Sequence, residues 1–199
     1  MPDERAEIIV IDSVTALTAS AADCVIVAGS HGSRFSAAIA TALGVRGVVF
    51  SDAGGGLDGA GVAGLALLDV HAIPAAAVSH MTARVGDGRD LWTRGVVSTI
   101  NTAAAGLGCA VGGACAEVAE RMRCAPPRGP VHMPLSEARV LLRREPVPVW
   151  GLDSNSLVRP EDAGAIVITG SHGGLLGGRP SSAVKAAVLA AVFNDAGVG

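Results

Sequence analysis

Short apolar runs recur along the chain, and each of them ends at a glycine or a polar residue. The clearest are EIIVID (7–12), DCVIVAG (23–29), VRGVVFSDAG (45–54), IPAAAVSH (73–80), VWGLD (149–153), AIVITG (165–170) and AAVFNDAG (190–197). Continuous runs of β-branched and aliphatic residues, without polar alternation, are typical of strands buried on both faces of a parallel sheet. The pattern therefore predicts a mostly parallel sheet.

Longer segments that are rich in small and aliphatic residues separate these runs. We predict helices at 34–44 (RFSAAIATALG), 59–70 (GAGVAGLALLDV) and 181–191 (SSAVKAAVLAA), and a long helix of small residues at 96–122. Strands that alternate with helices indicate βαβ units. The expected fold class is α/β, with a mostly parallel, Rossmann-like sheet that carries helices on both faces.

Two segments of the chain resemble each other. When Asp12 is aligned with Asp153, the sequence GSHG at 29–32 falls on GSHG at 170–173 without a gap. Further on, VVFSDAGGG (48–56) resembles AVFNDAGVG (191–199). The second copy has two more residues between GSHG and this block. Three similar blocks in register favour a partial internal duplication, with copies at about 8–56 and 149–199.

The stretch at 57–130 has no counterpart in the second copy. A proline-rich segment, CAPPRGPVHMP (124–134), overlaps the end of this stretch and is the one plausible linker. We interpret this segment as a bridge within a single α/β domain of residues 1–199, because the second copy alone is too short to bury a sheet.

Composition argues against several classes of function. The formal net charge is −3, aromatic residues make up 3% of the chain and tyrosine is absent, so nucleic-acid binding is not expected. The single lysine, Lys185, follows no Gly-rich phosphate loop and is expected on the surface. No apolar segment is long enough for a membrane span, and the first residues lack a signal-peptide core. We expect a cytoplasmic protein.

The spacing of cysteine, histidine and glycine gives no support for a metal or a cofactor. The four cysteines form no Cys-x-x-Cys pair, and no two histidines have His-x-x-x-His spacing. The loop has Gly-x-x-Gly where a dinucleotide fold has G-x-G-x-x-G. We therefore predict neither a metal nor a cofactor.

The repeated serine and histidine are the main candidates for chemistry. Ligands of parallel α/β sheets bind at the carboxyl ends of the strands, where both copies of GSHG are expected. A hydrolase would use as catalytic groups Ser30, His31, Asp52, Ser171, His172 and Asp195. Adjacent residues point in different directions, so a serine would pair with the histidine of the other copy, and the aspartates would orient the imidazoles. Either a serine or an activated water could then attack an amide, ester or cyclic imide bond.

A second set of residues is expected to bind the substrate. It comprises the loop glycines Gly29, Gly32, Gly170 and Gly173, together with His80, Arg84, Asp87 and Arg179. His80, Arg84 and Asp87 belong to a segment at 79–95 that we predict to be a polar loop at the same sheet edge. There Arg84 would orient an anionic substrate and Asp87 would cap the following turn. The predicted ligand is a small polar or anionic molecule.

An alternative from a different class is a non-catalytic subunit that binds an anion or a nucleotide. Backbone N–H groups of a glycine-rich loop that opens a helix suit such ligands. The small-residue segment 102–117 would allow close helix packing, either in a homo-oligomer or against a partner subunit. The sequence leaves both hypotheses open.

Overall fold

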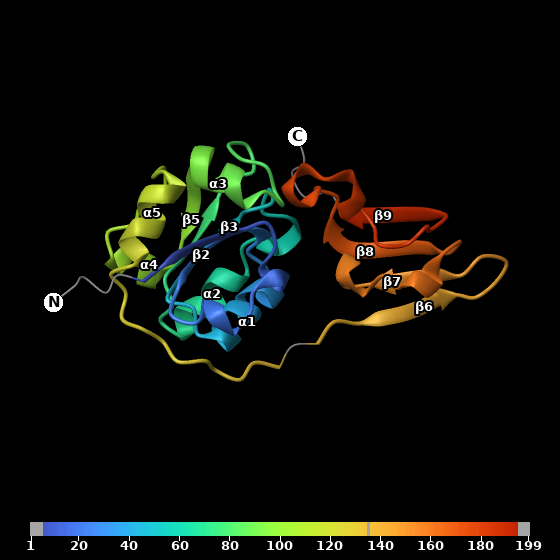
Figure 1. The fold of residues 1–199 in the computed structure, drawn as a ribbon, viewed down its shortest axis with the longest axis horizontal. Coiled ribbons are helices and arrows are strands. Elements are labelled where there is room, and N and C mark those ends of the chain that lie inside the picture. The colour runs from blue at the N-terminus through green and yellow to red at the C-terminus, as the bar shows by residue number, and fades with distance from the viewer. Residues whose placement is uncertain (1–5, 135, 195–199) are drawn as a thin grey trace.

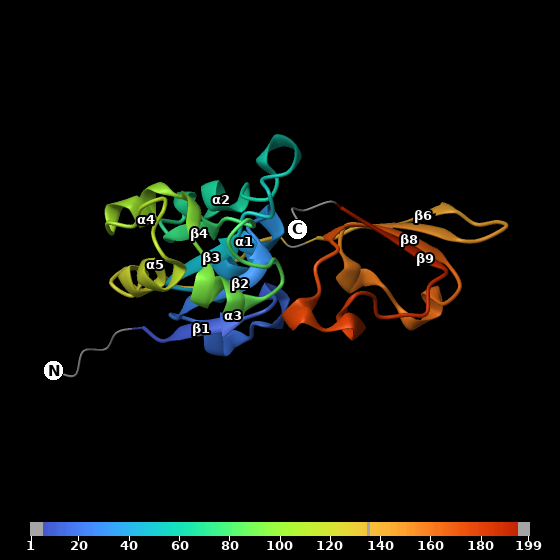
Figure 2. The same ribbon diagram turned by 90° about the horizontal axis from the view of Figure 1, so that it is seen from above.

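The computed structural model describes residues 6–134 and 136–194 and contains two β-sheets that lie side by side (Figure 1). Helices surround the first sheet, and the second sheet carries only short loops and 3-10 turns. A view from above shows the same separation (Figure 2). The chain is therefore an α/β protein with two mostly parallel mixed sheets, where the sequence predicted one shared sheet.

The first sheet has the strand order β1-β2-β3-β4-β5. Its strands are β1 (Ile8–Ile11), β2 (Val25–His31), β3 (Gly47–Ser51), β4 (Ala75–Val78) and β5 (Val97–Ile100). β1 to β4 are parallel, and β5 runs antiparallel to β4. Consecutive strands are neighbours, so this sheet lacks the reversal of strand order at which Rossmann folds bind dinucleotides.

Helices cover both faces of the first sheet. They are α1 (Arg34–Leu43), α2 (Gly64–Val70), α3 (Gly88–Arg94), α4 (Thr102–Gly106) and α5 (Cys115–Met122). On one face, α1 and α2 pack on a core that includes Ile26 and Phe50. On the other face, Leu91 of α3 and Met122 of α5 pack on Val27. The buried, nonpolar strands β2 to β4 therefore behave as their apolar runs predict.

The predicted helix at 34–44 is confirmed as α1. Ser33 is its N-cap and accepts a hydrogen bond from the backbone of Ser36 over 3.2 Å. Gly44 ends the helix with a φ of 68°, a left-handed conformation that glycine adopts at little cost. The capping residues thus place α1 directly after the GSHG sequence at 29–32.

The second sheet has the order β6-β7-β8-β9. Its strands are β6 (Arg139–Arg143), β7 (Val149–Leu152), β8 (Ile166–His172) and β9 (Ala190–Asn194). β7, β8 and β9 are parallel, and β6 is antiparallel to β7. A small core of Leu152, Val158 and Val167 lies beneath it.

One face of the second sheet is open. Val140, Ile168 and Val192 lie in one row across the sheet, and between 42% and 52% of each side chain is exposed. In the first sheet, a row with Val27 and Val49 is fully buried beneath α3 and α5. Among the described residues no α-helix covers the second sheet. The prediction of helices on both faces is therefore correct for the first sheet only.

The described residues also form seven short 3-10 helices. The 3-10 helices are η1 (Val14–Ala16), η2 (Ala19–Ala21), η3 (Leu57–Gly59), η4 (Asn155–Leu157), η5 (Pro160–Asp162), η6 (Leu176–Gly178) and η7 (Pro180–Ser182), and the extended segment 126–134 joins the two sheets (Figure 1). This segment is the proline-rich linker that the sequence predicts. Within the described residues, no helix is both long and apolar enough to cross a membrane.

The predicted helix at 181–191 is wrong. Only η7 and the start of β9 fall in this range. The Ser182 hydroxyl accepts from the backbone of Leu176 over 2.8 Å and donates to the carbonyl of Arg179 over 2.6 Å, which holds the chain in a local turn. A short alanine-rich helix needs a packing partner. α1 has α2 beside it, and the described part of the second half offers no such helix.

Two other helix predictions need correction. The range 96–122 contains β5, α4 and α5 where one continuous helix was predicted, so the predicted helix at 102–117 is also interrupted. Gly108 and Gly112 have φ values of 76° and 86°, which break any helix through them. The expected polar loop at 79–95 contains α3, capped by Asp87, whose carboxylate accepts from the backbone of Asp90 over 2.9 Å.

Candidate functional site

The two GSHG sequences end strands. β2 runs through Ser30 to His31, and β8 runs through Ser171 to His172. In each strand the pairing register shifts just before the histidine, between Val27 and His31 in the first case. A shift of this kind re-aims a side chain relative to the regular alternation of a strand. Both histidines are thereby placed at the carboxyl end of a parallel strand.

His31 and His172 meet between the two sheets. Their ring centroids lie 5.7 Å apart and the ring planes are at 85°, an edge-to-face contact. The two half-buried rings line a cavity of 410 Å³ to which both halves of the chain contribute. Other residues at this cavity include Ser13, Thr15, Ser30, Glu137, Ser154, Asn155, Ser171 and Lys185. We call it the histidine cavity.

The environment favours the neutral form of both imidazoles. Burial lowers the pKa of His31. Burial and the proximity of His31 lower the pKa of His172 to about 4. Nδ1 of His172 accepts a hydrogen bond from the backbone N–H of Gly174 over 3.1 Å, so the proton of the neutral ring is on Nε2. At neutral pH, His172 is a hydrogen-bond donor through Nε2.

Ser30 and Ser171 each accept a hydrogen bond from a backbone N–H group in the loop before their strand. The Ser30 hydroxyl accepts a hydrogen bond from the backbone N–H of Val14 over 2.9 Å, and the Ser171 hydroxyl accepts from that of Asn155 over 2.8 Å. Val14 and Asn155 begin η1 and η4. No serine–histidine hydrogen bond joins the two halves in the described part of the chain. The serines hold the preceding loop against the strand end, and the histidines are the groups that meet.

The loop glycines have a packing role. A Cβ on Gly29 would lie 2.5 Å from the backbone nitrogen of Asp87, and one on Gly170 would lie 2.8 Å from the carbonyl of Asp153. A Cβ on Gly32 would lie 3.0 Å from the Leu65 side chain. Gly173 has ordinary space around it. Of these four glycines, Gly170 alone lines the histidine cavity.

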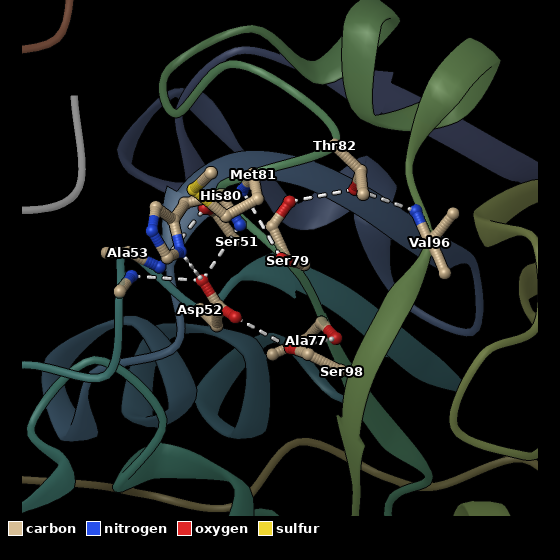
Figure 3. A network of polar contacts seen from close by, with 11 residues as sticks. Ser51, Asp52, Ala53, Ala77, Ser79, His80, Met81, Thr82, Val96 and Ser98 are labelled. Atoms are coloured by element: carbon tan, nitrogen blue, oxygen red, sulfur yellow. Dashed lines mark hydrogen bonds and ion pairs between the residues drawn. The ribbon is translucent and has the colours of Figure 1, made fainter. Parts of the chain in front are cut away.

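The sequence predicted that Asp52 orients an imidazole of the GSHG repeats, but in the structure Asp52 binds His80 instead. Its carboxylate accepts hydrogen bonds from the backbone and Nδ1 of His80 over 2.9 and 3.0 Å, and from the hydroxyl of Ser98 over 2.7 Å (Figure 3). The reason is topological, since β4 lies between β3 and β5 and brings His80 next to Asp52. Asp195 lies outside the described residues.

Three of the remaining predicted residues, His80, Arg84 and Asp87, lie around a second cavity. It has a volume of 540 Å³ and is lined by His80, Arg84, Asp87 and Arg94, with Gly174 shared between the two cavities. We call it the His80 cavity. Arg179 lines neither cavity and lies 3.8 Å from the carboxylate of Asp12. The predicted site is thus divided between two adjacent cavities.

Several residues of the histidine cavity were not predicted from the sequence. Asn155 and Glu137 are among them, and Lys185 was expected only to be solvated. Oδ1 of Asn155 is buried without a hydrogen-bond partner in the described part of the chain. The signal for Asn155 was its alignment with Val14 in the repeat. Glu137 gave no signal, because the loop that brings it near is set by β6, which the sequence did not predict.

No three histidine, cysteine, aspartate or glutamate side chains of the described residues are close enough to hold a metal ion. The described cysteines are free thiols, and burial raises the pKa of Cys115 to about 12. Comparison with family models, with curated proteins and with solved structures finds no match for this chain. The argument for function therefore depends on the geometry of the two cavities.

Proposed function

We propose that the histidine cavity is the active site of a hydrolase that cleaves an amide or cyclic imide bond in a small polar molecule. The observation that carries this proposal is the edge-to-face contact of His31 and His172, 5.7 Å between centroids, in a cavity lined by hydroxyl groups. Two neutral imidazoles side by side provide a proton acceptor and a proton donor for the same bond.

The roles follow from the hydrogen bond at His172. Because Nδ1 of His172 accepts from Gly174, its Nε2–H can donate to a carbonyl oxygen and stabilise the negative charge that develops there. His31 then accepts a proton from a water whose oxygen attacks the carbonyl carbon. The carbon–nitrogen bond breaks, and His31 returns the proton to the leaving nitrogen. A linear amide gives an acid and an amine, and a cyclic imide gives one ring-opened molecule with an acid and an amide group.

A water is a better nucleophile here than either serine. The lone pairs of Ser30 and Ser171 already accept backbone N–H groups at 2.9 and 2.8 Å. A hydroxyl oxygen that accepts a strong hydrogen bond has less electron density for attack, and neither serine is hydrogen-bonded to a histidine within the described residues. The serines support the site by fixing the loops around it.

An amide or imide substrate also suits the other polar groups. Such a group presents a carbonyl acceptor beside an N–H donor. The carbonyl matches Nε2–H of His172, and the N–H matches Oδ1 of Asn155, whose unmet hydrogen bond costs about 1–3 kcal/mol. Lys185 lines the same cavity and would contact an anionic substituent, whereas Glu137 and Asp153 of the lining would accept hydrogen bonds from donor groups of the substrate.

The test is hydrolysis of a panel of cyclic imides, linear amides and esters, measured by product mass. Wild-type protein should cleave at least one imide or amide, and His31→Asn and His172→Asn should each lose turnover by at least about 100-fold. His132→Asn is the matched control, since His132 is exposed and is not part of the cavity lining. Circular dichroism of each variant establishes that the fold is retained.

Saturable binding without turnover of any panel member would favour the alternative, an anion-binding or nucleotide-binding subunit. Lys185 is the observation that supports this alternative, because it supplies the positive charge of the histidine cavity lining. In that case His31→Asn should change affinity alone. Unchanged hydrolysis in both histidine variants would contradict the proposed mechanism.

We also infer that the two halves derive from a partial internal duplication. The order strand, two 3-10 turns, strand and strand occurs as β1, η1, η2, β2 and β3, and again as β7, η4, η5, β8 and β9. The equivalent serine hydroxyls make equivalent hydrogen bonds. The meeting of His31 and His172 is then the contact of two copies of one strand end.

A further inference from the structure

We propose that the His80 cavity is a second binding site, which takes a small oxyanion that also carries a hydroxyl donor, such as hydrogen phosphate or a hydroxy acid. The proposal is independent of hydrolysis at the histidine cavity. It depends on three features: the pairing of Asp52 with His80, the position of His80 on the cavity wall and the arginine beside it.

The carboxylate of Asp52 determines which nitrogen of His80 is available. Hydrogen bonds from the backbone of Gly54 and His80 and from Ser98 hold the pKa of Asp52 low, although burial alone would raise it. The ionised carboxylate accepts the proton of Nδ1 over 3.0 Å. In the neutral imidazole, Nε2 of His80 is then left with a lone pair that accepts a hydrogen bond.

His80 lies on the wall of the cavity, at the edge of the first sheet. Asp52 follows β3 and His80 follows β4, so both lie at the carboxyl ends of parallel strands, where α/β sheets bind ligands (Figure 3). The side chain of Asp52 is 13% exposed and is absent from the cavity lining, whereas His80 lines it. No described residue donates a hydrogen bond to Nε2. A ligand with an O–H group would supply that donor.

Arg84 supplies the complementary charge. Its guanidinium lines the same cavity, is 73% exposed and approaches the Asp90 carboxylate only at 3.9 Å. Arg94 instead satisfies Asp90 through two hydrogen bonds of 2.7 and 2.5 Å. Arg84 therefore keeps its hydrogen-bond donors for an oxyanion, which a guanidinium binds through two parallel contacts.

A purely structural role for the network predicts a different behaviour. Asp52, His80 and Ser98 also tie the ends of β3, β4 and β5 together (Figure 3). A structural network requires no particular anion. A site in which Nε2 accepts from the ligand should distinguish anions that carry a hydroxyl proton from anions of similar shape that lack one.

The experiment uses two matched pairs of probes at constant ionic strength. Inorganic phosphate is compared with sulfate, and lactate with propionate; in each pair the first member alone carries an O–H. Binding to the full chain is followed by long-range ¹H–¹⁵N spectra of ¹⁵N-histidine-labelled protein. We expect a saturable shift at Nε2 of His80, with the O–H member of at least one pair binding about tenfold more tightly. The signals of His71 and His132, which line neither cavity, should stay unchanged.

Variants separate binding from folding. Arg84→Met should weaken the binding of that anion about tenfold. Arg89→Met is the matched control: Arg89 is exposed on the same helix as Arg94, lies outside the cavity lining and should leave binding unchanged. In His80→Gln, calorimetry should give similar affinities for the two members of the pair, with the unfolding transition retained. Equal affinities for the two members in wild type, equal effects of the two arginine variants or no saturable shift would each overturn the proposal.

Discussion

The backbone N–H of Gly174 donates a hydrogen bond to Nδ1 of His172 over 3.1 Å. Gly174 is well suited to this contact, since a Cβ there would lie 2.9 Å from that same nitrogen and 2.9 Å from a methyl group of Val85. The contact orients the ring of His172 and assigns its proton to Nε2. It also connects the two cavities, because Gly174 lines both of them.

The protonation of His172 gives a prediction about pH. Nitrogen spectra should show its neutral ring protonated at Nε2, with a pKa of about 4 in place of 6.5. Replacing His31 by Asn should raise this pKa, because a charge that opposes protonation of His172 is removed. A titration of His172 at its usual pKa of 6.5 would contradict the structure.

The same pKa determines how stability depends on pH. The folded protein keeps His172 neutral down to about pH 4, whereas the unfolded chain binds a proton near 6.5. The unfolded state therefore binds more protons within this window, so the free energy of unfolding should fall as the pH drops from 6.5 to 4. Denaturant titrations of wild type and His172→Asn should differ in slope there, with a flatter profile for the variant.

The serine hydroxyls give a prediction that separates support from catalysis. Ser30→Ala removes the acceptor for the backbone of Val14, and Ser171→Ala removes that for Asn155. Each should lower the free energy of unfolding by about 1 kcal/mol and leave turnover within about an order of magnitude of wild type. A serine nucleophile would instead make one of these variants as inactive as His31→Asn, which steady-state kinetics would detect.

The glycines of the repeat should respond unequally to a methyl group. Gly29→Ala places a Cβ 2.5 Å from the backbone of Asp87, which must move, and should cost more than about 1–3 kcal/mol in thermal or denaturant unfolding. Gly173→Ala meets its first neighbour, the side chain of Phe193, at 3.6 Å and should fold as wild type. Equal effects at the two positions would show that the close approach at Gly29 is not maintained.

The pair of Arg139 and Asp162 should hold the second sheet to its turn η5. Their side chains are 12% and 2% exposed, and the guanidinium makes hydrogen bonds of 2.9 and 2.5 Å to the carboxylate. The same guanidinium lies 3.9 Å from the ring centroid of Trp150. Arg139→Met leaves the Asp162 charge buried and unpaired and should cost about 3–5 kcal/mol.

Arg143→Met provides the control for this pair. Arg143 is exposed on the same strand as Arg139, and its substitution should leave stability within about 0.5 kcal/mol of wild type. Hydrogen exchange of the β6 to β9 amides in the two variants would check both values. Comparable protection in both would mean that the buried ion pair contributes little to the second sheet.

The sequence alone determined the local features of this protein. The apolar runs correctly predicted β1 to β4 and β7 to β9, because short aliphatic runs that end at a glycine or a polar residue are typical of strands in a parallel sheet. Ser33 and Gly44 marked α1 through capping, which depends on a few neighbouring residues. Local signals failed at 181–191, because a short helix is stable only when another element packs on it.

The tertiary structure alone decided which of the predicted site residues contact each other. Spacing along the chain placed both histidines at strand ends, but the relative position of the two sheets decided that His31 meets His172 and that, among the described residues, neither is hydrogen-bonded to a serine. Strand order likewise decided that Asp52 binds His80, because the ends of β3 and β4 are adjacent in the sheet. Contacts between distant segments depend on how the elements pack, and no single segment of sequence records that packing.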